Sequence, residues 1–190
     1  MNSKPITCYL PILLIPGLIF LAGSLRQAYS QETTPQFRPS FHFSPPQNWL
    51  NDPNGLVFFD GEYHLFYQYN PQGNQWGNMS WGHAVTTDLI NWEHLPLAIP
   101  MSGNLMAFSG SVVIDWHNSS GFGDGNRPPM VAIYTATDGI QRQHLAYSHD
   151  KGRNWQNFAG NPVLNLYDDD FRDTRSEEHT SELQSPNTNS

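Results

Sequence analysis

The order of apolar and turn-forming residues indicates an all-β chain made of β-propeller blades. From Phe41 onward, short apolar and aromatic runs alternate with Gly, Pro, Asn and Asp, and no stretch shows a helical period. Two related segments, Ala84–Trp92 and Ala146–Trp155, begin 62 residues apart, as expected for a repeat of four short strands. Residues 41–174 are therefore expected to hold about two blades and the start of a third.

Eight strands follow from this pattern. They are expected at residues 56–59, 63–69, 81–86, 92–99, 109–115, 130–135, 144–148 and 155–158. Asp60-Gly61 predicts a tight hairpin between the first two strands. In both copies of the repeat a Ser or Thr precedes an Asp by two residues, and a Trp opens the next strand. We expect Asp88 and Asp150 to accept turn amides and the Trp residues to pack between blades, which is a structural role.

The heptapeptide Trp49–Gly55 places one carboxylate, Asp52, among aromatic, amide and turn residues. Asn54-Gly55 is a strong turn signal and a strand-like run follows it, so Asp52 is expected where a loop enters a strand. Two interpretations fit the heptapeptide alone. One is an Asx-type turn that caps a hairpin, and the other is a carbohydrate site made of a carboxylate, an aromatic platform and amides.

The spacing of the blades favours the carbohydrate site. Asp52, Ser109 and Asp173 are 57 and 64 residues apart, close to one blade each, and each falls at or just before the first strand of a blade. The first strands of propeller blades line the central channel. We therefore expect these three side chains to converge on one funnel.

Five motifs in order carry a resemblance to a known family. They are Trp49–Gly55, Phe66–Pro71, Trp81–Ala84, Phe108–Ser111 and Phe171–Asp173. Over residues 40–173 the chain resembles glycoside hydrolase family 32, which includes invertases, levanases and inulinases. The resemblance implies a five-bladed propeller, with a C-terminal β-sandwich that we expect to be missing here. It also implies hydrolysis of terminal β-fructofuranosyl bonds in sucrose, levan or inulin, with retention and a covalent fructosyl-enzyme.

The resemblance assigns roles residue by residue. Asp52 matches the nucleophile, and a carboxylate suits an oxocarbenium-like transition state. Asp173 matches the residue that binds fructose hydroxyls and stabilises the transition state, and Arg172 is expected to keep Asp173 ionised and positioned. The remaining expected contacts to substrate are Asn51, Gln68, Trp76 and Ser109, with Trp49 and Trp81 as an apolar wall of the funnel.

The chain departs from the family pattern in two places. Thr174 stands where the family continues Arg-Asp with Pro, and no Glu-Cys motif supplies the general acid/base. Retaining chemistry needs a second carboxyl about 5–5.5 Å from the nucleophile. The chain by itself is therefore expected to bind substrate poorly and to be inactive. We also expect it to be poorly soluble, because inter-blade faces are exposed. Two alternatives stay open: a fructosyltransferase on the same scaffold, and a non-catalytic glycan-binding propeller.

Both ends of the chain are expected to lie outside the folded domain. Residues 1–30 read as a signal peptide cleaved after Ser30, which predicts a secreted or periplasmic protein with no membrane segment in its mature form. Residues 31–40 form a polar lead-in. Residues 175–190 begin with a run that matches the in-frame translation of a sequencing-library adapter, so we expect this tail to be an artefact.

Composition excludes several partners. The net charge is −8 and basic residues do not cluster, which argues against nucleic acid. Fructose-containing saccharides are the expected partners. The single cysteine, Cys8, lies within the predicted signal peptide. The eight His are scattered without zinc-ligand spacing, so no metal or cofactor is expected. His83 and His144 are expected to satisfy strand-level hydrogen bonds and not to bind metal.

Overall fold

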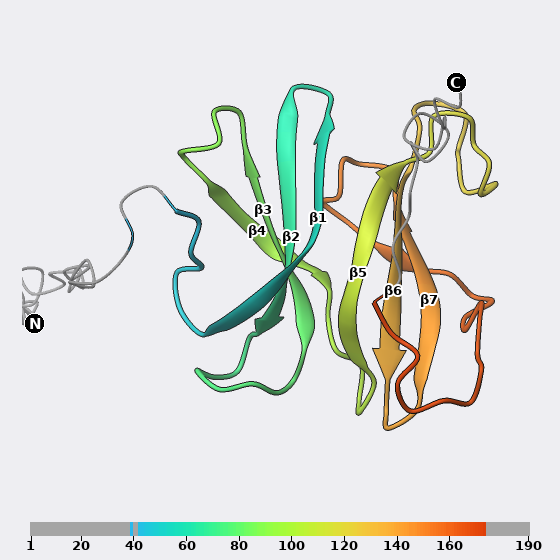
Figure 1. Ribbon diagram of the computed structural model, residues 1–190. Coiled ribbons are helices and arrows are strands. Elements are labelled where there is room, and N and C mark those ends of the chain that lie inside the picture. The colour runs from blue at the N-terminus through green and yellow to red at the C-terminus, as the bar shows by residue number, and fades with distance from the viewer. Residues whose placement is uncertain (1–38, 40–41, 174–190) are drawn as a thin grey trace, which may run out of the picture. The chain divides into compact units, whose positions relative to one another are not determined.

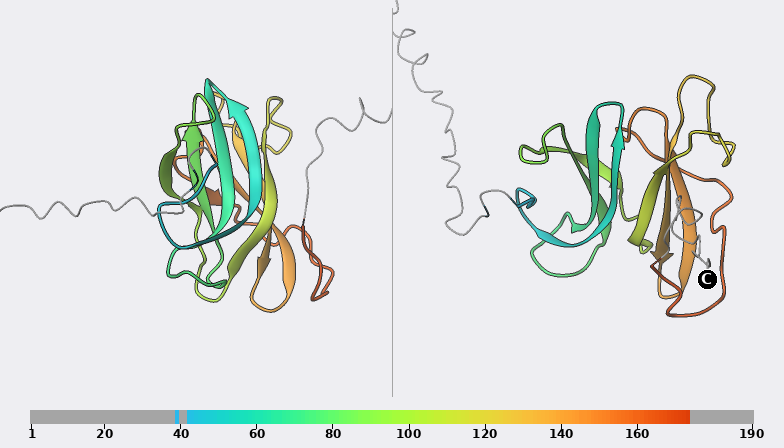
Figure 2. Two further views of the ribbon diagram at one scale, coloured as in Figure 1. Left: turned by 60° about the vertical axis from the view of Figure 1, so that its left-hand side comes forward. Right: turned by 45° about the horizontal axis from the view of Figure 1, so that its top comes forward.

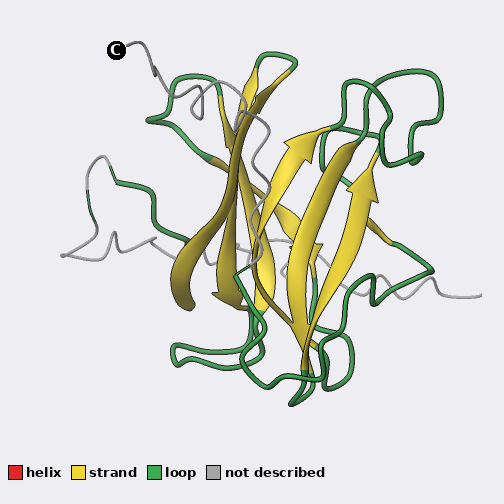
Figure 3. Cartoon of the chain, turned by 45° about the vertical axis from the view of Figure 1, so that its right-hand side comes forward, coloured by secondary structure: helices red, strands yellow, loops and turns green. Residues whose placement is uncertain are grey.

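Two four-stranded antiparallel sheets make up the part of the chain described by the computed structural model, residues 39 and 42–173 (Figure 1). The first sheet has the order β1-β2-β3-β4 and the second β5-β6-β7-β8. Their bounds are β1 Trp49–Phe59, β2 Glu62–Asn70, β3 Ser80–Thr86, β4 Glu93–Ile99, β5 Met106–Ile114, β6 Met130–Thr137, β7 Gln141–Ser148 and β8 Gln156–Asn157. All eight expected strands are confirmed. These described residues contain no helix (Figure 3), and hence none long and apolar enough to cross a bilayer.

The first strands of the two sheets, β1 and β5, lie side by side (Figure 2). Side chains from both sheets fill the space between them, so one apolar core joins the sheets. The largest of its fully buried members are Phe66 and Trp81 from the first sheet and Met130 from the second. This arrangement brings the starts of β1 and β5 together, where the predicted site residues lie.

The turn predicted at Asn54-Gly55 is wrong, and with it the interpretation of the heptapeptide as a hairpin cap. β1 runs through the whole heptapeptide, with register shifts between Leu50 and Pro53 and between Pro53 and Gly55. Bulges of this kind accommodate Pro53, which has no amide hydrogen to donate. Gly55 instead allows a close approach between sheets, because a Cβ there would lie 3.1 Å from the backbone nitrogen of Val112.

The other turn predictions are confirmed. Asp60 and Gly61 have φ of 49° and 87° and close the β1–β2 hairpin. Asp88 accepts the backbone amides of Ile90 at 2.9 Å and Asn91 at 2.7 Å. The hydrogen bonds from Asn91 hold the pKa of Asp88 well below its usual value.

Asp150 plays the same part in the second repeat, where it accepts the amide of Asn154 at 2.8 Å. Trp155 then packs edge-on against Phe66 of the first sheet, with ring centroids 5.5 Å apart, as expected for an inter-blade residue. Trp92 differs. Its ring meets that of Phe43, with ring centroids 5.3 Å apart, and so packs against the segment before β1.

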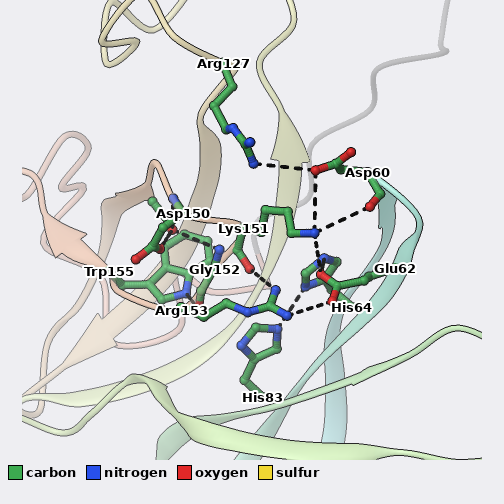
Figure 4. Close-up of polar contacts among 11 residues, drawn as sticks. Asp60, Glu62, His64, His83, Arg127, Asp150, Lys151, Gly152, Arg153 and Trp155 are labelled. Carbon is green, nitrogen blue, oxygen red and sulfur yellow. Dashed lines mark hydrogen bonds and ion pairs between the residues drawn. The ribbon is translucent and has the colours of Figure 1, made fainter.

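A charged cluster joins the two sheets at the β1–β2 hairpin (Figure 4). The Glu62 carboxylate forms ion pairs with Arg153 at 2.8 Å and with Lys151 at 3.1 Å. The Asp60 carboxylate forms longer ion pairs with Lys151 and Arg127, each at 3.5 Å. Both partners of Glu62 come from the turn that follows β7. Although burial raises the pKa of Glu62, hydrogen bonds from Arg153 and Lys151 lower it overall.

A fully buried imidazole pair lies beneath this cluster. The ring nitrogens His64 Nδ1 and His83 Nε2 are 3.1 Å apart, and His64 Nε2 lies 3.8 Å from Glu62 Oε2. The hydrogen bond of His83 thus runs to the neighbouring strand β2, in line with the expected strand-level hydrogen bonding. For His144 the expectation fails at Nε2, which is buried without a partner, while the ring packs against Tyr134.

Acid is expected to destabilise the described domain through this pair. Burial, with Arg153 nearby, lowers the pKa of His64 to about 4, and burial next to His64 lowers that of His83 to about 3. Since unfolded histidines bind protons near pH 6.5, the unfolded chain gains protons first as pH falls, and stability present above pH 6.5 is lost toward pH 4. Each of the two histidines contributes on the order of 3 kcal/mol to this loss by pH 4. Urea unfolding followed by tryptophan fluorescence at low protein concentration measures it.

The window from pH 6.5 to 4.5 isolates the histidines, because Glu62 contributes only below its ordinary pKa of 4.5. A His64→Gln, His83→Gln double variant is the matched control and is expected to have a flatter pH dependence in that window. An unchanged slope in the double variant would contradict the assignment.

Candidate active site

A cavity of about 300 Å³ opens beside the start of β1 and β5. Its lining comes from β1, β2, β5, the loop between β2 and β3, and the last described segment. The lining residues are Asn51, Asp52, Gln68, Trp76, Phe108, Ser109, Arg172 and Asp173. Asp52, Ser109 and Asp173, the three positions expected to converge from their spacing, all lie on this one cavity.

The bulge in β1 aims Asp52 at the cavity. Leu50 pairs with Tyr69 and Pro53 with Tyr67, so Asn51 and Asp52 together oppose Gln68 of β2. A two-against-one bulge bends its strand and redirects side chains, and such bulges are frequent next to active sites. Asp52 is consequently held on a strand, which fixes a reacting group better than the loop expected from the sequence.

Ser109 of β5 fixes the orientation of the Asp52 carboxylate. Its hydroxyl Oγ donates to Asp52 Oδ2 at 2.9 Å, across the junction of the two sheets. A hydrogen bond to one carboxylate oxygen leaves the other oxygen able to attack or accept. The two first strands together therefore build a positioned, ionisable oxygen on the cavity wall.

Asp173, the second carboxylate that lines the cavity, lies on the segment after the second sheet. Gln143, a buried residue of β7, donates from Nε2 to the carbonyl of Phe171 at 2.8 Å and so anchors this segment. Arg172 lies 3.8 Å from Asp173 Oδ2 and is closer to Asp170, at 2.9 Å. The predicted Arg172–Asp173 pair is thus a long one. Gln143 was missed because a strand Gln carries no signal of its role in the sequence.

Trp49 and Trp81 do not form the predicted apolar wall. Trp81 is fully buried in the inter-sheet core and donates from Nε1 to the carbonyl of Phe108 at 2.9 Å. Trp49 is not part of the lining and donates to Asn51 Oδ1 at 3.0 Å. Both predictions as wall residues are therefore wrong, and both side chains support residues that do line the cavity.

Trp76 and Phe108 supply the aromatic surface instead. Their rings meet edge-on with centroids 6.1 Å apart, and Trp76 is 56% exposed. Phe108 was not predicted as a site residue, although its place directly before Ser109 was a signal. Exposed aromatic rings beside carboxylates and amides suit the apolar faces and hydroxyls of a sugar.

A larger hollow of about 470 Å³ lies at the other end of β5, beside Trp116. Asp115 lines this hollow, and its carboxylate accepts hydrogen bonds from the backbone amides of Ser119 and Ser120, each at 2.8 Å. Asp115 therefore caps a loop. The smaller cavity is the stronger candidate because it carries two carboxylates. Among residues 39 and 42–173 no group of three or more His, Cys, Asp or Glu is placed to hold a metal.

Comparison with known proteins places this geometry in a family. Residues 42–181 match the N-terminal domain of the glycosyl hydrolases of family 32, and the chain belongs to that family. The predicted fold class is confirmed, with the two four-stranded sheets as two blades of the family's five-bladed propeller. The match ends inside the segment 175–190, which lies outside the described residues, so the artefactual tail stays a prediction.

Three similar proteins illustrate the match. The levanase of Bacillus subtilis is 49% identical over 177 residues, which are 92% of this chain and 26% of the levanase. The extracellular exo-inulinase of Aspergillus awamori is 42% identical over 166 residues, covering 77% of this chain and 30% of the inulinase. A fructofuranosidase of Schwanniomyces occidentalis, solved with fructose, matches with a TM-score of 0.72 and 39% identity over 76% of this chain and 30% of its own. The chain thus spans between about a quarter and a third of these relatives.

Proposed function

We propose that residues 42–173 carry the nucleophile side of an active site that hydrolyses terminal β-fructofuranosyl bonds of sucrose, levan or inulin. The observation that carries the proposal is that Asp52 and Asp173 line one cavity together with polar Asn51, Gln68 and Ser109. The named activities of the similar levanase and exo-inulinase support it, as does the fructose bound to the similar fructofuranosidase.

In the proposed reaction an Asp52 oxygen attacks the anomeric carbon of fructose while the bond to the leaving group breaks, giving a covalent fructosyl-enzyme. The Ser109 hydroxyl holds Asp52 in one orientation through its 2.9 Å hydrogen bond. Asp173 accepts hydrogen bonds from fructose hydroxyls, and these strengthen as positive charge develops on the ring. Water then releases fructose with retention.

A second carboxyl must protonate the leaving group. Within the described residues, the cavity lining offers only the carboxylates of Asp52 and Asp173. We propose that a Glu outside the described residues supplies the proton and later activates water, as general acid and base. The assay therefore needs a complete active site.

The experiment is a chimera in which residues 42–173 replace the matching segment of the B. subtilis levanase. We expect release of fructose from sucrose, levan or inulin, and, after acid quench during turnover, one fructosyl group on the peptide that contains Asp52. An inactive but folded chimera, or a fructosyl group on another residue, would contradict the proposal. Growth of oligofructans from concentrated sucrose would identify the fructosyltransferase alternative instead.

The 190-residue chain assayed alone is expected to release no fructose above the buffer control. The reason is that attack by Asp52 without a proton donor must expel an alkoxide, and general acid catalysis contributes about 10²–10⁴-fold. Chromatography of overnight incubations with sucrose measures the product. Turnover by this chain, abolished by Asp52→Ala, would show that the chain contains its own acid.

We also propose that the protein is exported. The apolar stretch and small-residue cleavage pattern of residues 1–30 support this, as does the extracellular location in the name of the similar exo-inulinase. Residues 1–30 lie outside the described part of the chain. Mass spectrometry of the secreted product would test cleavage after Ser30.

A further inference from the structure

Asn54 lies at a β-bulge of β1, where the strand register to β2 is interrupted. It is 3% exposed and follows Asp52 by two residues. Pro53 pairs with Tyr67 and Gly55 with Phe66, so Asn54 is an extra residue without a partner in the register. A buried polar side chain at such a bulge must find hydrogen bonds elsewhere.

The Asn54 side chain finds its partners on the next two strands. With the amide oriented by the hydrogen bonds that it satisfies, Asn54 Oδ1 accepts from Gln68 Nε2 and from Trp81 Nε1, each at 3.0 Å. It also accepts from the backbone nitrogen of Gln68 at 3.3 Å. One oxygen of β1 therefore binds both β2 and β3.

The same two donors continue across to the second sheet. Gln68 Nε2 donates its other hydrogen to the carbonyl of Ala107 at 3.0 Å. Trp81 Nε1 has a single hydrogen, which it shares between Asn54 Oδ1 and the carbonyl of Phe108 at 2.9 Å. These carbonyls directly precede Ser109, whose hydroxyl returns to Asp52 at 2.9 Å. The hydrogen bonds thus form a closed ring that starts and ends on β1.

We infer that Asn54 is a positioning residue, whose amide oxygen fixes the Ser109–Asp52 hydrogen bond by holding Gln68 and Trp81 against the start of β5. The inference rests on the proposed function of Asp52. Asn54 does not line the cavity. Removing its oxygen leaves two buried donors with one acceptor fewer each, which loosens the contact of β2 and β3 with the start of β5, where Ser109 lies.

The test compares three variants in the levanase chimera. Asn54→Leu keeps the size and removes the acceptor, and Asn54→Asp keeps an acceptor oxygen in the same place. Val112→Ala is the control for stability, because Val112 is buried, packs against Gly55 at the same junction and takes no part in the ring of hydrogen bonds. Melting temperatures, kcat and KM are measured for all of them.

We expect Asn54→Leu to lower kcat about 100-fold, the effect of misplacing a reacting group by about 1 Å. KM should change far less, Asn54→Asp should restore most of kcat, and Val112→Ala should lower the melting temperature without this loss. Equal kcat in Asn54→Leu and Val112→Ala would overturn the inference, as would equal loss in Asn54→Leu and Asn54→Asp.

Crystal structures keep the two proposals separable. If the parent chimera is inactive, the proposed function fails, and the distance between Ser109 Oγ and Asp52 Oδ2 still decides the role of Asn54. A distance that lengthens in Asn54→Leu and stays near 2.9 Å in Val112→Ala supports positioning. A distance unchanged in both variants overturns it, whether or not the chimera is active.

Discussion

Asp52→Ala in the levanase chimera is expected to lower kcat on sucrose by about 10⁵-fold while the protein remains folded. The loss is this large because the carboxylate forms the covalent bond itself, so its removal closes the double-displacement route. Ser109 Oγ, which donates to Asp52 at 2.9 Å, cannot substitute because it is a neutral hydroxyl. Initial rates of fructose release and the melting temperature are the measurements.

Rescue of Asp52→Ala by a small anion is a more specific test of the role of Asp52, because the substitution leaves the space of the carboxylate empty. A small anion such as azide can occupy the space of the missing carboxylate and attack the anomeric carbon in a single displacement. We expect azide to restore cleavage in Asp52→Ala and to give a product of inverted configuration, because one displacement inverts and two retain. Ser109→Ala leaves the carboxylate in place, so it should lose less activity and gain nothing from azide. Retained activity in Asp52→Ala would contradict the nucleophile assignment.

The features that sequence predicted correctly depend on local chemistry. Asp60-Gly61 closes a hairpin because both residues accept positive φ, and Asp88 and Asp150 cap turns because an Asp side chain reaches amides two to four residues on. The strands followed from short apolar runs between such turns. These signals act within a few residues, so no knowledge of the tertiary structure was needed.

The features that sequence missed depend on tertiary contacts, some between the strands of one sheet and some between the two sheets. Asn54-Gly55 has turn chemistry, but the Asn amide is satisfied by Gln68 and Trp81, and Gly55 is required by the approach of Val112. Trp81 was expected on the funnel because it belongs to a family motif. It lies in the core because the alternation of β3 turns its ring toward the second sheet, where it meets Tyr134. A motif thus identified residues near the site without showing which of them face it.

Asp173→Asn in the same chimera is expected to lower kcat/KM by about 10²–10³-fold, corresponding to about 3–4 kcal/mol of transition-state stabilisation. Asparagine keeps the shape of the side chain and one acceptor oxygen. It removes the negative charge that strengthens hydrogen bonds from fructose hydroxyls as the oxocarbenium-like charge develops. The expected loss is therefore smaller than for Asp52→Ala, and azide should not relieve it, because Asp173 forms no covalent bond.

Asp170→Asn is the matched control for Asp173→Asn. Asp170 lies three residues away, is 2.9 Å from Arg172 and does not line the cavity. If Asp173 acts on the sugar, Asp170→Asn keeps kcat/KM near that of the parent. If the two variants lose activity equally, the carboxylates act only by holding Arg172, and the stabilising role belongs to the guanidinium. The geometry favours a direct role for Asp173. Its contact to Arg172 is 3.8 Å, too long for a hydrogen bond, whereas its side chain lines the cavity with Asp52.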